Sequence, residues 1–211
     1  MINILEAASN LYQSNLDLKN FAKWPDDLVN SNLPPRMIPA AKLVENFPLS
    51  GTTETNPLIE AIKANVNLMH WKRTYTEEEV GHDLYNRYGY CELFGPEGHF
   101  NSTQLRGFIG YWGNGLDYDW HSHEAEEIYL NLGGNAIFRT KEEEILLNPN
   151  KTNKHLRLFN KYCKNPLPRV GRNWGQFFKV CIAGLQLAIG VIVLLVSAIK
   201  CCIISSSFFK G

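Results

Sequence analysis

The chain has few cysteines, and they show none of the spacings that cysteines take when they hold a fold together. Its 211 residues contain five, without a CxxC pair or a regular framework. An odd number of unpaired cysteines argues against a disulfide-stabilised scaffold and fits a reducing compartment. The same absence excludes a zinc-ribbon protein. The N-terminus lacks a basic region followed by an apolar core, so we expect no signal peptide.

Acidic residues are absent from the last part of the chain. All 21 Asp and Glu residues lie at or before Glu144, whereas Lys and Arg continue as far as Lys210. The net charge of zero therefore hides two regions of different character. Because the basic stretch 151–179 precedes a hydrophobic segment, we interpret its charge as flanking a membrane. We expect no nucleic-acid binding.

One long uncharged hydrophobic run is present, at residues 180–199. Gln186 and Ser197 are its clearly polar residues, and Lys179 and Lys200 bracket it. A helix that spans a bilayer needs about 20 apolar residues, so the run predicts one transmembrane helix. More positive charge precedes the run than follows it, which predicts a single-pass membrane protein whose N-terminal body is cytosolic. The alternative is a buried helix.

The pattern changes from helical to β near residue 88. Apolar residues at helical spacing predict one or two helices within 2–22 and another within 56–70. Thr76 and Glu79 have the spacing of a capping box, which predicts a short helix ending near residue 87. From residue 88 to about residue 140, short apolar segments alternate with glycines, as is typical of an antiparallel sandwich or barrel.

These patterns predict a mainly β fold with N-terminal helices, a partial β-barrel and one C-terminal transmembrane helix. The expected organisation is an N-terminal helical region at 1–87, a partial barrel at 88–147, a basic proline-containing linker at 148–179, the transmembrane helix at 180–199 and a short tail at 200–211.

The stretch GLDYDWHSHEAEEIYLNLGG, residues 115–134, is the strongest candidate for a functional site. His121, His123, Glu127 and Tyr129 are all odd-numbered. Side chains of equal parity in an extended chain lie on one face, so two imidazoles, a carboxylate and a phenol would converge. Such a group suits a divalent metal beside an acid or base. The alternatives are surface histidines on an edge strand, a solvated acidic run and a tyrosine that merely favours β structure.

The spacing G(x)5HxH(x)3E(x)6G is met here without a gap and resembles the first metal-binding motif of the cupin barrel. The run YWGNGLDYDWHSHEAEEIYLNLGGNAIF is more specifically similar to the cupin-type dimethylsulfoniopropionate (DMSP) lyases, also called dimethylpropiothetin dethiomethylases. MHWKRTYTEEE, YNRYGYCELFGPEGHF and GFIGYWG resemble the region before the barrel in that family. The resemblance covers about residues 56–140.

The resemblance implies an enzyme that holds a divalent metal, such as iron, zinc or manganese. His121, His123 and Glu127 would be ligands, together with a later histidine, and Tyr129 would be the base. The substrate would be DMSP, cleaved to dimethyl sulfide and acrylate. Aromatic side chains favour a sulfonium cation, so four residues are candidates for the pocket wall, with core or rim positions as the alternative: Tyr111, Trp112, Tyr118 and Trp120.

The sequence departs from the family after about Thr140. The second cupin motif, which should supply the last histidine, is absent. His155 is the only histidine after His123, but it lacks the proline-glycine turn and the following asparagine, so we do not expect it to be a ligand. We also expect the strands that should close the barrel to be missing, with the basic stretch and the hydrophobic run in their place. An open sheet edge would favour self-association, for example as a homodimer.

Two functions of different classes follow from this pattern. The first is a metal-dependent carbon–sulfur lyase that acts on DMSP. The second is a catalytically impaired or inactive, truncated cupin fragment that is tethered to a membrane and acts, if at all, by binding. Another cupin activity, such as that of a dioxygenase or sugar isomerase, shares the HxH and Glu pattern but not the EExY ending or the upstream blocks.

Overall fold

The computed structural model describes residues 1–48, 51–121, 126–139, 144–155, 178–181 and 191–198. Its helices are α1 (Ile2–Ser14), α2 (Leu16–Phe21), α3 (Pro39–Glu45), α4 (Asn56–Asn65), the 3-10 turn Val66–Leu68 and α5 (Glu77–Arg87). Its strands are β1 (Val29–Asn30), β2 (Trp71–Lys72), β3 (Tyr88–Phe94), β4 (Phe100–Asn101), β5 (Leu105–Trp112), β6 (Asp117–His121), β7 (Glu127–Gly133), β8 (Ala136–Arg139), β9 (Glu144–Leu147), β10 (Thr152–His155), β11 (Phe178–Cys181) and β12 (Val191–Ala198).

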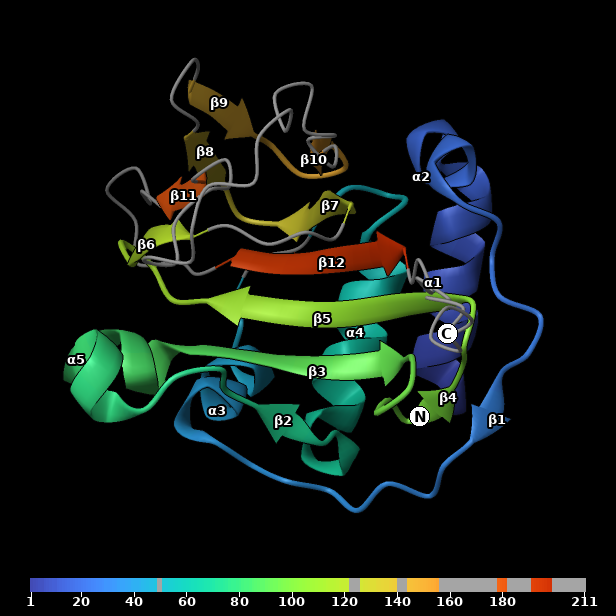
Figure 1. The fold of residues 1–211 in the computed structure, drawn as a ribbon, viewed down its shortest axis with the longest axis horizontal. Coiled ribbons are helices and arrows are strands. Elements are labelled where there is room, and N and C mark those ends of the chain that lie inside the picture. Colours follow the sequence, from blue (N-terminus) through green and yellow to red (C-terminus); the bar gives the residue numbers. More distant parts are fainter. Residues whose placement is uncertain (49–50, 122–125, 140–143, 156–177, 182–190, 199–211) are drawn as a thin grey trace, which may run out of the picture.

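The described strands form two sheets. The larger has the order β1-β4-β3-β5-β12-β7-β10, with β2 paired to β3, and the smaller has the order β6-β11-β8-β9. Figure 1 shows α1 and α4 behind the larger sheet and α5 at one end of β3. Apolar side chains of α1 and α4, such as Ile4 and Ile62, share one core with Ile109 of β5 and Leu130 of β7. This core holds the sheet on the helices.

The predicted helices are confirmed. The run expected within 2–22 forms α1 and α2, and the run expected within 56–70 forms α4 and the turn that follows it. The predicted capping box is also present, because the backbone N–H of Thr76 donates to Glu79 Oε2 over 2.8 Å. Helix α5 then continues to Arg87, with a kink at Gly81, whose φ is +77°. Local signals were sufficient for these elements.

The predicted transmembrane helix at 180–199 is wrong. Residues 180 and 181 end strand β11, and residues 191–198 form strand β12, which lies between β5 and β7 (Figure 1). Its partners run from Trp112 to Leu105 on β5 and from Gly133 to Glu127 on β7. The remaining residues of the predicted span lie outside the described part of the chain. A continuous apolar run is typical of a buried central strand as well as of a membrane helix, so hydropathy alone does not distinguish them.

The predicted membrane location is overturned with it. Among the helices of the described residues, none combines the length and the apolar character that crossing a bilayer requires. The membrane as a partner, the single-pass topology and the cytosolic body tethered by residues 180–199 all depended on that helix. Lys179 and Cys181, at the predicted membrane boundary, instead pair with Arg139 and Ile137 of β8.

The expectation that the closing strands are missing is also wrong. Three strands, β10, β11 and β12, follow Pro149 in the described residues. β10 extends the larger sheet beyond β7, and β11 joins β6 to β8 in the smaller sheet. Segments without a recognisable motif therefore form strands in the part of the fold that the sequence predicted to be open.

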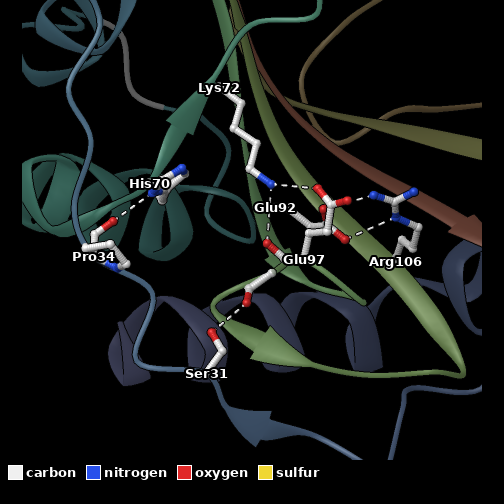
Figure 2. Close-up of polar contacts among 8 residues, drawn as sticks. Ser31, Pro34, His70, Lys72, Glu92, Glu97 and Arg106 are labelled. Carbon is white, nitrogen blue, oxygen red and sulfur yellow. Dashed lines mark hydrogen bonds and ion pairs between the residues drawn. The ribbon is translucent and has the colours of Figure 1, made fainter.

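The turn after β3 is held by several polar contacts (Figure 2). Arg106 donates two hydrogen bonds to the carboxylate of Glu92, of 3.1 and 2.9 Å, and the Lys72 ammonium lies 3.1 Å from Glu97 Oε2. His99, which is 3% exposed, accepts a 2.8 Å hydrogen bond at Nε2 from the backbone N–H of His70. Burial, followed by the nearby charge of His70, lowers the pKa of His99 from 6.5 to about 4. The folded state therefore favours the neutral form of His99.

We expect Leu194→Ala to lower the free energy of unfolding by about 2–5 kcal/mol, because it opens a cavity beside a fully buried side chain. Urea denaturation measures the change. The matched control is Leu146→Ala on β9, where the leucine is 52% exposed and the effect should stay within about 0.5 kcal/mol. Equal, small effects of the two substitutions would contradict the placement of β12 in the core.

Stability should fall as the pH is lowered through the window set by His99. Between pH 6.5 and about 4, the unfolded chain binds a proton at His99 that the folded chain does not bind, so the stability present above pH 6.5 is lost towards pH 4. His99→Gln puts an uncharged acceptor near the His70 N–H, and should reduce this loss by on the order of 2 kcal/mol. Urea denaturation across this range measures it. His82→Gln, at an 85% exposed side chain, is the control, and identical slopes for all three proteins would refute the assignment.

Candidate functional site

Strand β7 presents two chemically different faces, although all seven of its residues are buried. Ile128, Leu130 and Leu132 belong to the core that contains α1 and α4. Tyr129 belongs to a second cluster on the other side, with Phe138 of β8 among its members. The alternation predicted from odd and even positions is confirmed for these residues.

Glu127 and Tyr129 are joined directly on the second face. The Tyr129 hydroxyl donates a 2.8 Å hydrogen bond to Glu127 Oε2. The two residues are 9% and 5% exposed. Because the bond has an ionisable acceptor and lies away from water, it is stronger than a hydrogen bond between neutral surface groups. The pair therefore places a phenol and a carboxylate in direct contact, away from water, at the start of β7.

Burial raises the pKa of Tyr129 well above 10.0, and the negative charge of Glu127 raises it further. The phenol is consequently protonated at neutral pH unless positive charge is brought close to it. A cation near Glu127 would act in that direction. Because Tyr129 is hydrogen-bonded to Glu127, a cation held by Glu127 would lower the pKa of Tyr129.

Several aromatic rings belong to the same cluster as Tyr129. The ring centroids of Tyr88 and Tyr118 are 5.2 Å apart, and those of Tyr88 and Trp112 are 5.3 Å apart. The Tyr118 hydroxyl donates to the hydroxyl of Tyr75 over 3.2 Å. Burial raises the pKa of Tyr88 to about 12 and also raises that of Tyr118, so both rings are neutral. Neutral aromatic faces attract cations.

Trp112 occupies its place because Gly110 has no side chain. A Cβ at Gly110 would lie 2.5 Å from Trp112 Cζ3, which no real Cβ tolerates. The indole Nε1 of Trp112 is buried and has no hydrogen-bond partner in the described structure. The indole thus offers an unused donor among the aromatic rings.

The structure separates the four aromatic residues that were predicted to line a pocket. Trp112 and Tyr118 lie in the cluster that contains Tyr129. Tyr111 lies in the other core, where its ring is 6.3 Å from that of Phe47 in an edge-on arrangement, so its assignment to the same wall does not hold. Adjacent residues of a strand face opposite sides. The side chain of Trp120 lies outside the described part of the chain.

The predicted metal ligands are only partly described. Glu127 begins β7, and the backbone of His121 ends β6, opposite Phe178 of β11. The side chain of His121 and the whole of His123 lie outside the described residues. Within the described residues, no three metal-binding side chains gather into one cluster. The ligand set therefore stays a prediction.

Sequence reasoning did not single out Tyr75 and Tyr88, although both belong to or pack against the cluster around Tyr129. The signal for Tyr88 was its alternation with Tyr90 in a predicted strand, and β3 does place Tyr88 opposite Trp112. The backbone position of His155, opposite Glu127 in the pairing of β10 with β7, had no signal in the sequence.

Comparisons with known proteins identify the family of this chain. The profile of the dimethylsulfoniopropionate lyase family matches residues 14–161. The dimethylsulfoniopropionate lyase DddQ of Ruegeria pomeroyi is 35% identical over 137 residues, which are 64% of this chain and 68% of that protein.

Solved structures of such lyases have the same fold. One, described as belonging to the DMSP lyases RdDddP and RnDddQII, superposes with a TM-score of 0.80 at 30% identity and covers 93% of this chain and 91% of its own. DddQ from Ruegeria pomeroyi superposes with a TM-score of 0.78 at 26% identity, covering 93% and 89%. The family profile spans most of the chain, and the described strands form a cupin-like, mainly β fold. The chain belongs to the dimethylsulfoniopropionate lyase family.

Proposed function

We propose that this protein cleaves DMSP to dimethyl sulfide and acrylate by a metal-assisted elimination, with Tyr129 as the base. The hydrogen bond of 2.8 Å between Tyr129 and Glu127, within a buried aromatic cluster, is the observation that carries the proposal. Family membership supports the same reaction.

The residues around Tyr129 suit the two charged ends of the substrate. DMSP carries a sulfonium at one end and a carboxylate at the other. The faces of Tyr88, Trp112 and Tyr118 would attract the sulfonium, and a desolvated cation–π contact contributes about 2 kcal/mol. The free indole N–H of Trp112 is a donor that a carboxylate oxygen can accept. Burial of these groups also excludes water from the reacting atoms.

In the proposed reaction Tyr129 removes a proton from the carbon next to the carboxylate. The electron pair of that C–H bond forms the double bond of acrylate, and the C–S bond breaks with its electron pair leaving on sulfur. The proton ends on the Tyr129 oxygen, from which water can take it. A positioned base typically contributes about 10²–10⁴-fold to the rate.

The donor set fits a divalent ion. Imidazole nitrogens of His121 and His123 and a carboxylate oxygen of Glu127 are ligands that zinc, iron and manganese accept. When bound, the ion would polarise the substrate carboxylate and lower the pKa of the neighbouring phenol. Glu127 would be one of the residues that hold the ion, and it also accepts the hydrogen bond of Tyr129. This arrangement would offset the two causes, burial and the charge of Glu127, that raise the pKa of Tyr129.

We expect the purified chain, supplied with divalent metal and DMSP, to release dimethyl sulfide and acrylate in equal amounts. Headspace gas chromatography and proton NMR measure the two products. Tyr129→Phe should lower kcat by about 10²–10⁴-fold because it removes the base, while metal content stays unchanged.

The matched control is Tyr85→Phe, since the ring of Tyr85 stacks under Arg73 at 3.8 Å and has no part in the cluster around Tyr129. That variant should keep full turnover. Product formation no greater than in buffer would refute the lyase proposal and favour a role in binding. Full activity of Tyr129→Phe would remove Tyr129 as the base but leave the reaction.

A further inference from the structure

Residues 26–36 form a strap along one edge of the larger sheet, at the end of the strand order that is farthest from β10 (Figure 1). The short strand β1 within the strap pairs with β4, and Leu28 packs against the core. Val29 is 63% exposed, and several hydrogen bonds tie the rest of the strap to the fold. Segments that bury little apolar surface open more easily than the core. The strap can therefore loosen while the sheet stays folded.

Two contacts hold the middle of the strap. The backbone N–H of Ser31 donates to the carbonyl of His99 over 3.0 Å, and its hydroxyl donates to the carbonyl of Gly98 over 2.7 Å. The ring Nδ1 of His70 lies 2.7 Å from the carbonyl of Pro34 (Figure 2). A carbonyl only accepts hydrogen bonds, so this nitrogen is the donor. The strap is thus held by the turn after β3 and by the residue that precedes β2.

His99 joins these two contacts. Its carbonyl holds Ser31, and its ring Nε2 accepts the 2.8 Å hydrogen bond from the backbone N–H of His70. A proton on Nε2 would face the N–H of His70, so two donors would meet and the bond would be lost. The residue is 3% exposed, and a buried imidazolium without an acceptor is costly. Protonation therefore favours a state in which the ring reaches water.

The ionisable groups near His99 offer no free negative charge to an imidazolium. Those that carry or can carry positive charge oppose a further proton, and they are His70, Lys72 and the amino group of Met1. The nearby carboxylates are in ion pairs with Arg106 and Lys72, and they are Glu92 and Glu97. Acid therefore acts on this contact without a neighbouring carboxylate to compensate it.

The two ends of the strap are anchored separately. The hydroxyl of Ser102 donates a 2.6 Å hydrogen bond to the carboxylate of Asp27 and lowers the pKa of Asp27 from 3.8. This carboxylate consequently stays ionised above pH 3.8. At the other end, the backbone of Arg36 donates to the carbonyl of Met69 over 3.1 Å and accepts from the N–H of Trp71 over 2.9 Å. Residues 31–35 lie between these anchors.

We propose that the strap is an acid-sensitive clasp with His99 as its trigger. When Nε2 of His99 takes a proton from solvent, the bond to His70 is lost and residues 31–35 detach, while Asp27 and Arg36 keep the strap tethered. The proposal is independent of the proposed reaction, because it involves neither β7 nor the aromatic cluster around Tyr129.

Hydrogen exchange followed by NMR tests the clasp, with the amides of Ser31 and His70 as reporters and that of Ile109 in β5 as the reference. Lowering the pH from about 7.5 to about 4.5 should raise the opening equilibrium at both reporters by on the order of 10–100-fold, after correction for intrinsic exchange, because the open form binds a proton at His99. Ile109 should stay more protected than the reporters at both pH values. His99→Gln should make the opening nearly independent of pH, and His82→Gln, at an 85% exposed side chain, should behave as the wild type.

Ser31→Ala gives a second test, which also serves if His99→Gln folds poorly. It removes the hydroxyl bond to the turn and should raise the opening at every pH by about 2–10-fold, with the response to acid retained. Equal protection of Ser31 and Ile109 would show that the strap opens only with the whole fold, which would overturn the clasp. So would unchanged opening in Ser31→Ala. A wild type without a response to acid, or the same response in His99→Gln, would overturn the role of His99.

Discussion

The hydrogen bonds of Asn131 tie β7 to the two segments that follow it. Through its backbone and side chain, this residue reaches Gly134, Leu147, Asn150 and Lys151. The return from β8 through β9 to β10 is thereby fixed against β7 at one buried point. Successive side chains of a strand lie on opposite faces. Fixing the register of a strand beside β7 therefore also fixes which of its residues lie on the side of the helices and which lie on the side of Tyr129. The core and the candidate site both depend on it.

Strand β7 is buried on both faces, so the polar groups of the candidate site lie away from water. Tyr129 lies in a buried cluster of aromatic residues and donates a hydrogen bond to Glu127, and in such surroundings charge is poorly screened and a single hydrogen bond is strong. The same burial raises the pKa of Tyr129, which opposes its use as a base. In the proposed reaction, a cation would have to offset this effect. The proposed activity therefore depends on the aromatic cluster, the Glu127 carboxylate and the ion together.

The fold could be predicted wherever the signal was local. Helical spacing and the capping box at Thr76 located the helices, since both depend on residues three or four positions apart. The run at 180–199 was misread for an equally physical reason. Hydropathy records that side chains avoid water, but not whether lipid or protein surrounds them. Strand β12 pairs with β5 on one side and with β7 on the other, and its valines and isoleucines favour a strand.

For the site, the sequence by itself determined the alternation along β7, with Tyr129 on one face and Ile128 and Leu130 on the other. Alternation also places the adjacent residues Tyr111 and Trp112 on opposite faces, although both were predicted to line the same pocket. Only the tertiary structure decided that β12 lies beside β7, that Tyr75 and Tyr88 adjoin Tyr118, and that the backbone of His155 stands opposite Glu127. The physical reason is that the face of a residue follows from its own extended backbone, whereas a strand's partner and register follow from packing and hydrogen bonds between segments far apart in the chain.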